Sequence, residues 1–280
     1  MSASSIPSVA PNYASIMVPM DLTPEADNRC KLAANLADRF SSRLIGVAAQ
    51  PVTAPLYFEA PIQGLPSIIE IDEKRAAEEL TEAQTNFQRA AGTRNRIEWR
   101  QALAFTTPYV IEQARAADLI VAARPRRDDP AFAPMSVDAG SLVMDAGRPV
   151  LFVPPKVDYL AAKCIVIGWK DSREARRAVW DALPLLKAAK DVLVVSVDED
   201  NDGAKDVVNH LACHGVAASN LGRPVSAAGI ADDLVGIAQQ QGADLIVCGA
   251  YGHSRAREWI LGGVTHDLLD HAPLCCLMSH

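Results

Sequence analysis

The end of the chain, ADLIVCGAYGHSRAREWILGGVTHDLLDHAPLCCLMSH (residues 243–280), decides which fold the sequence predicts. It opens with an apolar run typical of a buried strand, breaks at Gly249 and Gly252, and meets Gly262 and Gly263 before a helical pattern. Glycine tolerates positive φ and has no Cβ, so such a strand end can turn sharply and present backbone amides. A helix start adds unpaired amides and a dipole that favours an anion. The alternative is that these glycines only allow the chain to turn in an ordinary loop before a helix. Two glycine clusters at the carboxyl edge of a strand favour a phosphate-binding loop instead.

The same opening occurs earlier in the chain, which indicates an internal duplication. Asp118 in ADLIVAA corresponds to Asp244, and Ala146 corresponds to Ala272 at the same offset, so the segment between them aligns without a gap. At the positions of the four glycines the first copy has Ala123, Arg126, Ser136 and Val137. The glycines therefore belong to one copy alone.

Strand and helix patterns alternate through both copies. ASIMVPMD (14–21) and CIVIGWKD (164–171) are short apolar runs, and each leads into a helical pattern. We expect one continuous helix over SREARRAVWDALPLLKAA (172–189) and a proline-bearing loop over 50–67 before an acidic helix at 71–91. Uninterrupted apolar strands that alternate with helices predict a parallel sheet covered on both faces. Two prolines near residues 153–163 mark the expected boundary between the copies.

Bulk properties restrict the function classes. The chain has 280 residues, 49% of them apolar, and a formal net charge of -7, which is the composition of a soluble globular protein. An acidic chain without a basic run does not favour nucleic acid as a partner. No apolar run reaches the ~18 to 20 residues of a membrane span, and the start lacks the pattern of a secretory leader. We therefore expect a cytoplasmic protein that contacts neither nucleic acid nor membrane.

The six cysteines do not have the spacing of a metal site. Most of them lie inside apolar strand or helix patterns, and no CxxC pair or Cys/His spacing resembles a zinc site. We expect reduced thiols in the core and no bound structural metal. Cys275 and Cys276 are adjacent, but neighbours on a strand point to opposite faces, which disfavours a redox pair.

The stretch GAYGHSRAREWILGGVTHDLLDHAP closely resembles the nucleotide loop of the universal stress protein family, with its pattern G-x2-G-x9-G-[S/T]. The resemblance runs through both halves, about 14–155 and about 162–280. It implies two tandem Rossmann-like α/β domains, residues 1–156 and 160–280, each with a five-stranded parallel sheet of order 3-2-1-4-5 and helices on both faces. It also implies that ATP, or another adenine nucleotide such as ADP or AMP, binds at the carboxyl ends of strands 1 and 4. In tandem members the two domains usually pair with each other as the family's dimers do.

This resemblance assigns nucleotide-binding positions to the second half. They are Gly249, Gly252, His253, Ser254, Gly262, Gly263, Val264, Thr265, Lys170 and Val197. Two of them depart from the family pattern. Gly263 stands where the family has Ser or Thr, so Thr265 is the nearest hydroxyl. Lys170 stands where the family has the adenine-facing Asp that the first half keeps as Asp21, and lysine is a donor that cannot accept from an adenine amino group. Either Asp171 substitutes for it, or Lys170 reaches a phosphate.

The first half is expected to bind no nucleotide. It carries RPRRDDPAFAPMSV in place of the glycines, where Pro125 and Val137 stiffen and crowd the cradle. Its arginines Arg124, Arg126 and Arg127 leave two alternatives open: a site for some other anion, or a solvated loop neutralised by its own aspartates. We favour the solvated loop and expect this half to be a structural partner of the second.

Three functional hypotheses follow from the sequence. The preferred one is a stress-response protein that binds ATP, with Mg²⁺ as an optional companion, and hydrolyses it slowly or not at all, because no residue pattern predicts a catalytic group. The second is a tandem protein that has lost nucleotide binding and works as an interaction scaffold. The third is a slow ATPase or kinase-like enzyme. A homodimer is a further option that the sequence leaves open.

Overall fold

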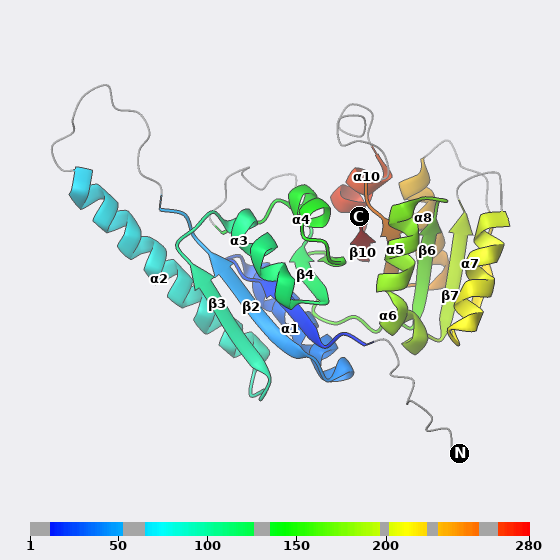
Figure 1. Cartoon of the computed structure of the whole chain (residues 1–280), viewed down its shortest axis with the longest axis horizontal. Helices are drawn as coiled ribbons and strands as arrows, with labels where there is room; N and C mark the ends of the chain where they lie inside the picture. Colours follow the sequence, from blue (N-terminus) through cyan, green and yellow to red (C-terminus); the bar gives the residue numbers. More distant parts are fainter. Residues whose placement is uncertain (1–11, 53–64, 126–134, 197–201, 223–228, 252–262) are drawn as a thin grey trace, which may run out of the picture.

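The computed structural model describes residues 12–52, 65–125, 135–196, 202–222, 229–251 and 263–280 (Figure 1). Within these residues ten strands form one sheet, in the order β3-β2-β1-β4-β5-β10-β9-β6-β7-β8. The predicted α/β class is therefore correct, and strands alternate with helices along the chain. Each half of the sheet, followed from its outer edge inward, has the expected order 3-2-1-4-5.

The elements of the first half lie between residues 15 and 153. They are β1 (Ser15–Pro19), α1 (Pro24–Phe40), β2 (Arg43–Ala49), α2 (Leu65–Ala91), β3 (Ile97–Ala102), α3 (Thr106–Gln113), the 3-10 turn η1 (Ala114–Ala116), β4 (Leu119–Ala123), α4 (Ala139–Asp145) and β5 (Val150–Val153). The second half follows after residue 163. It contains β6 (Cys164–Trp169), α5 (Arg173–Asp181), α6 (Leu183–Ala188), β7 (Asp191–Ser196), α7 (Asp202–Cys213), β8 (Ala218–Asn220), α8 (Ile230–Gln241), β9 (Leu245–Gly249), α10 (Val264–His271) and β10 (Cys275–Ser279).

The two halves join through their last strands. β10 pairs with β5 in antiparallel fashion, with Cys276 opposite Phe152 and Met278 opposite Val150. The other strand pairs are parallel, as the continuous apolar strands predicted. The expected two separate sheets are thus one continuous sheet. Because the junction is antiparallel, the carboxyl edges of the two half-sheets point in opposite directions.

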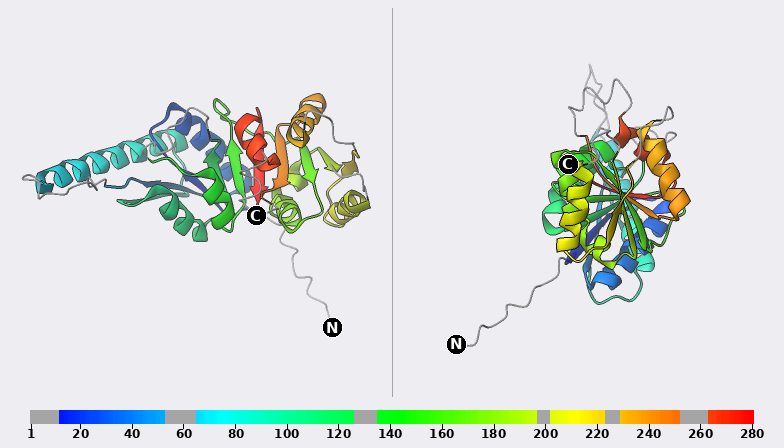
Figure 2. Two further views of the ribbon diagram at one scale, coloured as in Figure 1. Left: turned by 90° about the horizontal axis from the view of Figure 1, so that it is seen from above. Right: turned by 90° about the vertical axis from the view of Figure 1, so that its right-hand side faces the viewer.

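Helices cover both faces of this sheet (Figure 2). One buried cluster packs α1, α2, α5, α6 and α7 on one face, and a second packs α3, α4, α8 and α10 on the other. Side chains alternate between these clusters along each strand, as the period of a strand requires: Ile16 and Val18 belong to the first cluster, Met17 to the second. Both clusters run across the β5–β10 junction, so the halves share their core.

Two helix predictions need correction. The helix expected over 172–189 is two helices, α5 and α6, because Pro184 has no amide and its ring clashes with the carbonyl one turn before it. The helix expected from residue 71 begins at Leu65, since Pro66 in the first turn costs no hydrogen bond. The amino-terminal part of α2 reaches beyond the edge strand β3 (Figure 1).

The cysteines are free, as expected. Burial raises the pKa of Cys30, Cys248 and Cys275 to about 12. A thiol with such a pKa is almost wholly protonated at neutral pH and is a poor nucleophile. Cys213 is the exposed exception. No helix among the described residues is long and apolar enough to cross a membrane.

A buried tyrosine ties the two halves together beside their junction. The Tyr13 hydroxyl donates to the carbonyl of Asp181 at the end of α5, with 2.7 Å between the oxygens. Tyr13 is 3% exposed, and burial, helped by Asp181 and Asp118, raises its pKa far above the usual value. The hydroxyl therefore stays protonated and keeps donating across the working pH range.

Removal of this hydroxyl tests how firmly the halves are joined. Tyr13→Phe should lower the free energy of unfolding by about 1 kcal/mol, the usual net value of a buried neutral hydrogen bond. Urea denaturation followed by circular dichroism measures it. Tyr159→Phe is the matched control, because Tyr159 is 64% exposed, and its unfolding curve should not move. Equal shifts in both variants would contradict a role for the Tyr13 bond.

Candidate functional site

Strand register places the two copies of the site at equivalent positions. Ile16 pairs with Leu119 between β1 and β4, and Ile165 pairs with Leu245 between β6 and β9. With Ile165 as the counterpart of Ile16, Lys170 is the counterpart of Asp21. Gly249 is in the same way the counterpart of Ala123. The correspondence proposed from the sequence therefore holds in three dimensions.

Gly249 is required by packing. A Cβ added there would lie 2.6 Å from the amide nitrogen of Ala175 and 2.7 Å from the carbonyl carbon of Glu174, both in the first turn of α5. Its φ is not positive, so the predicted use of glycine for a left-handed turn at this position is wrong. The residue in the left-handed region is Tyr251, with φ of 51°. Close contact between β9 and α5 thus explains Gly249 without a ligand.

Thr265 joins the two ends of the glycine-bearing segment. Its Oγ1 accepts a hydrogen bond from the amide of Tyr251 at 3.1 Å, and Thr265 is 3% exposed. The hydroxyl proposed as a replacement for the family's Ser or Thr therefore holds the end of β9 against the start of α10. Ala250 is fixed as well, because its amide donates to the carbonyl of Ser279 at 2.8 Å.

The head of α10 has the geometry expected of an anion site. Gly263 is its N-cap, with extended backbone (φ −91°, ψ 153°), and supplies no side-chain hydrogen bond to the helix. The first amides of a helix, here from Val264 onward, have no intrahelical partner. Asp267 lies in the first turn, as expected, and competes there with any anion for the positive end of the helix dipole.

Charged groups surround the start of α5. Lys170 is exposed just beyond the end of β6, and Asp171 forms an ion pair with Arg176 at 2.6 Å. Burial raises the pKa of Glu174, but hydrogen bonds from its own amide and from Ser172, together with Arg173, bring that pKa below its usual value. The carboxylate of Glu174 is therefore ionised at neutral pH. In the part of the chain that the structure describes, no group of three or more potential metal ligands occurs.

Several predicted site residues lie outside the described residues. They are Gly252, His253, Ser254, Gly262 and Val197. The described ones, Gly249, Gly263, Val264, Thr265 and Lys170, follow β6 and β9 or begin α10, which are the elements that the family pattern uses. Their convergence on a common ligand stays a prediction.

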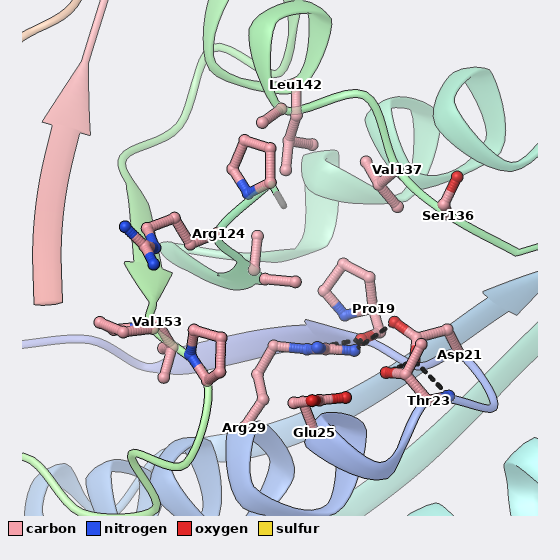
Figure 3. A pocket seen from close by; sticks show the side chains of 16 residues that line it. Pro19, Asp21, Thr23, Glu25, Arg29, Arg124, Ser136, Val137, Leu142 and Val153 are labelled. Atoms are coloured by element: carbon pink, nitrogen blue, oxygen red, sulfur yellow. Dashed lines mark hydrogen bonds and ion pairs between the residues drawn. The ribbon is translucent and has the colours of Figure 1, made fainter. Parts of the chain in front are cut away.

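The corresponding place in the first half is filled by an ion pair. Arg29 on α1 is 3% exposed, and its Nη2 lies 2.7 Å from Oδ2 of Asp21. Its Nε and Nη2 also donate to the carbonyl of Pro19, at 3.2 and 2.9 Å. Oδ1 of Asp21 accepts from the amide and the hydroxyl of Thr23. Both carboxylate oxygens of Asp21 are thus engaged by protein groups (Figure 3).

The cavity that remains around this pair is small. It has a volume of about 100 Å³, well below the ~300 Å³ or more of typical ligand pockets. It lies at the carboxyl ends of β1 and β4, and Val137 and Leu142 line it opposite Asp21. Arg124 also lines it, but its guanidinium points away from the Asp21–Arg29 pair. Its Nε and Nη1 are buried without a hydrogen-bond partner, so these two nitrogens are not solvated as predicted. Arg126 and Arg127 of the same predicted loop lie outside the described residues.

Arg29 is the residue that sequence reasoning missed. The same register that aligns Asp21 with Lys170 aligns Arg29 with Ala178, which is fully buried in α5. An arginine on the apolar face of a predicted helix, opposite alanine in the second copy, was the available signal. Where the first half holds a guanidinium, the second has a methyl group.

Solved structures share the doubly wound α/β fold of this chain. A universal stress protein from Archaeoglobus fulgidus DSM 4304 aligns with a TM-score of 0.67 at 14% identity, over 95% of each chain. A putative universal stress protein from Pseudomonas aeruginosa UCBPP-PA14 aligns with a TM-score of 0.51 at 16% identity, over 95% of this chain and 93% of its own. Both likenesses show the fold.

Residues 227–280 match the model of the Universal stress protein family, which is the family that the sequence of this segment resembles. No curated protein matches the chain significantly. A universal stress protein solved in complex with cAMP aligns at 20% identity over 41% of this chain and 78% of its own. Its TM-score of 0.29 is too low to support a conclusion about this site.

The close contact at Gly249 gives a test that needs no ligand. Gly249→Ala should lower the free energy of unfolding by about 1 to 3 kcal/mol, because the new methyl group displaces the backbone of α5. Gly236→Ala is the matched control. Nothing lies within 4 Å of a Cβ there, so this change within α8 should be neutral or stabilising by up to ~1 kcal/mol. Thermal unfolding of both variants measures the two changes in stability. A Gly249→Ala protein as stable as the wild type would refute the packing role of Gly249.

Proposed function

We propose that the carboxy-terminal domain, residues 160–280, binds an adenine nucleotide, ATP above ADP or AMP, through the loop between β9 and α10. Its turnover of that nucleotide is slow or absent. The observation that carries the proposal is the head of α10, where a side-chain-free N-cap, Gly263, is held beside the end of β9 by the bond between Thr265 and Tyr251. Helix amides in such a position bind phosphate oxygens.

The surroundings of this helix suit a phosphate chain. Lys170 follows β6, the strand next to β9, and brings a cation to the carboxyl edge at which ligands of open α/β sheets bind. Ala178 puts no guanidinium at the place that Arg29 occupies in the first half. The family match at residues 227–280 covers the whole glycine pattern.

We assign Lys170 to the phosphates. Lysine cannot accept from an adenine amino group, and Asp171, the other candidate, is paired with Arg176 at 2.6 Å. Base selection in this domain therefore rests on fewer polar contacts than in family members with the aspartate. We expect ATP and GTP to differ in affinity by less than tenfold.

The amino-terminal domain, residues 1–156, acts in this proposal as a structural partner without nucleotide. The Asp21–Arg29 pair takes up both the carboxylate and the space that a base would need, and the cavity of about 100 Å³ does not admit a nucleotide. Its contribution is the β5–β10 junction, which covers the edge of the second half-sheet.

A scaffold that binds no nucleotide is the competing function. The feature in its favour is Asp267, whose charge opposes an anion at the head of α10. Absence of binding for ATP, ADP and AMP would select this alternative. A slow ATPase is the third hypothesis, and it requires phosphate release that Gly252→Val abolishes.

Exchange of one residue between the halves tests the proposal. Gly263→Val gives the second half the residue that the first has at the same place, and the extended backbone of Gly263 accepts valine. Isothermal titration of the wild-type chain with ATP, with and without Mg²⁺, should show one site per chain. The variant should bind at least tenfold more weakly, because the side chain covers the helix amides.

Val137→Gly in the first half is the matched control, and it should leave one site with unchanged affinity. Thermal unfolding of both variants checks that the fold persists, since the loss of a glycine N-cap costs up to ~1 kcal/mol. Two ATP sites in the wild-type chain would contradict the assignment of the first half. An affinity that Gly263→Val leaves intact would refute the site.

A further inference from the structure

Two histidines lie one turn apart at the end of α7, and neither is one of the candidate nucleotide residues. His210 and His214 are four positions apart, so they share one side of the helix. Their ring centroids are 4.7 Å apart, with planes inclined at 72°. We propose that these two rings form a two-ligand site for a divalent transition metal ion, with the remaining coordination positions left to water or to a small ligand.

The ring separation fits the coordination geometry. An imidazole nitrogen binds such an ion at about 2.0 to 2.1 Å, which puts each ring centroid about 3.2 Å from the ion. Two rings then have centroids about 4.5 Å apart for a right-angle N–metal–N geometry and about 5.2 Å apart for a tetrahedral one. The observed 4.7 Å lies between these values. The separation of the two rings is therefore compatible with both binding one ion.

Neighbouring groups hold the pair in place and favour a cation. The ring of Trp180 on α5 packs edge-on against His214, with centroids 5.6 Å apart. α7 ends at Cys213, and Gly215 at φ 76° terminates the helical turn, so His214 stands at the negative end of the helix dipole. These contacts reduce the entropy lost when the rings are fixed by a metal.

Open coordination positions have room beside His210. A cavity of about 400 Å³ lies between α5 and α7, and its apolar side is formed by Trp169, Val179 and Val207. Its polar side is formed by His210, Asp206 and the ion pair of Asp171 with Arg176. Among the residues described, no third His, Cys, Asp or Glu completes a closed ligand set with the pair. The site is therefore open and exchangeable, unlike a structural zinc site with four protein ligands.

The first half has no such pair. Buried positions of α7 (Ala204, Val207, Leu211) follow the same spacing as those of α2 (Leu80, Ala83, Phe87). This correspondence puts Asn86 and Ala90 at the places of the two histidines. The proposed site is thus a property of the second half, as the glycine-bearing loop is.

Ni²⁺ is the probe that tests the proposal, because imidazole pairs bind it well and it does not oxidise the exposed Cys213. Calorimetric titration of the full chain should show one Ni²⁺ per molecule. His210→Ala and His214→Ala should each weaken binding at least tenfold, and acidification should weaken it in the wild type because protonated imidazole does not bind metal. Cu²⁺ should compete more strongly than Zn²⁺, following their general order of affinity.

His266→Ala/His271→Ala on α10 is the control. These residues are five positions apart and do not share a helix face, so the double variant should bind Ni²⁺ like the wild type. His210→Gln keeps a polar side chain without an imidazole and separates metal loss from a folding defect. Ni²⁺ binding that survives His210→Ala and His214→Ala, or that disappears with the α10 histidines, would overturn the proposal. Titration with ATP is expected to be the same for the three variants of His210 and His214 as for the wild type.

Discussion

Antiparallel pairing between β5 and β10 is the constraint on which the architecture depends. Each half alone would leave its last strand as an open edge, with unpaired amides and carbonyls. Pairing Cys276 with Phe152 and Met278 with Val150 closes both edges and turns two five-stranded layers into one sheet with two shared cores. It also directs the two carboxyl edges in opposite directions, so the two copies of the site are distant from each other and free to diverge.

The divergence has a simple electrostatic form. The first half keeps the family's acidic residue, Asp21, but neutralises it with a buried arginine whose other hydrogen bonds go to the backbone of Pro19. Removal of one partner would leave the other charge buried without a counter-ion, which is strongly destabilising. The ion pair is therefore a stable occupant of this space. In the second half Lys170 and Ala178 stand in the places of Asp21 and Arg29, so an exposed cation follows β6 and no guanidinium stands at position 178 to pair with a carboxylate.

Glycines in the second half serve more than one purpose. Gly249 permits α5 to approach the strand, and Gly263 begins α10 without capping it by a side chain. Thr265 holds the two ends of the same segment together. Its hydroxyl was expected to face a ligand but instead accepts a hydrogen bond from the backbone amide of Tyr251. A glycine pattern that resembles a ligand loop thus combines positions that packing requires with positions that a ligand would use.

The sequence by itself determined the fold class and the duplication, because hydrophobic period and repetition are local properties of the chain. The strand order of each half and the equivalence of Asp21 with Lys170 followed from the resemblance to the family. The sequence also placed Gly263 at a helix start. Tertiary structure decided what local patterns cannot encode: the merging of two sheets, the burial of Arg29 against Asp21, and the contact that forbids a side chain at Gly249. Each of these depends on groups brought together across different elements, by distances that appear only after the helices have packed on the sheet.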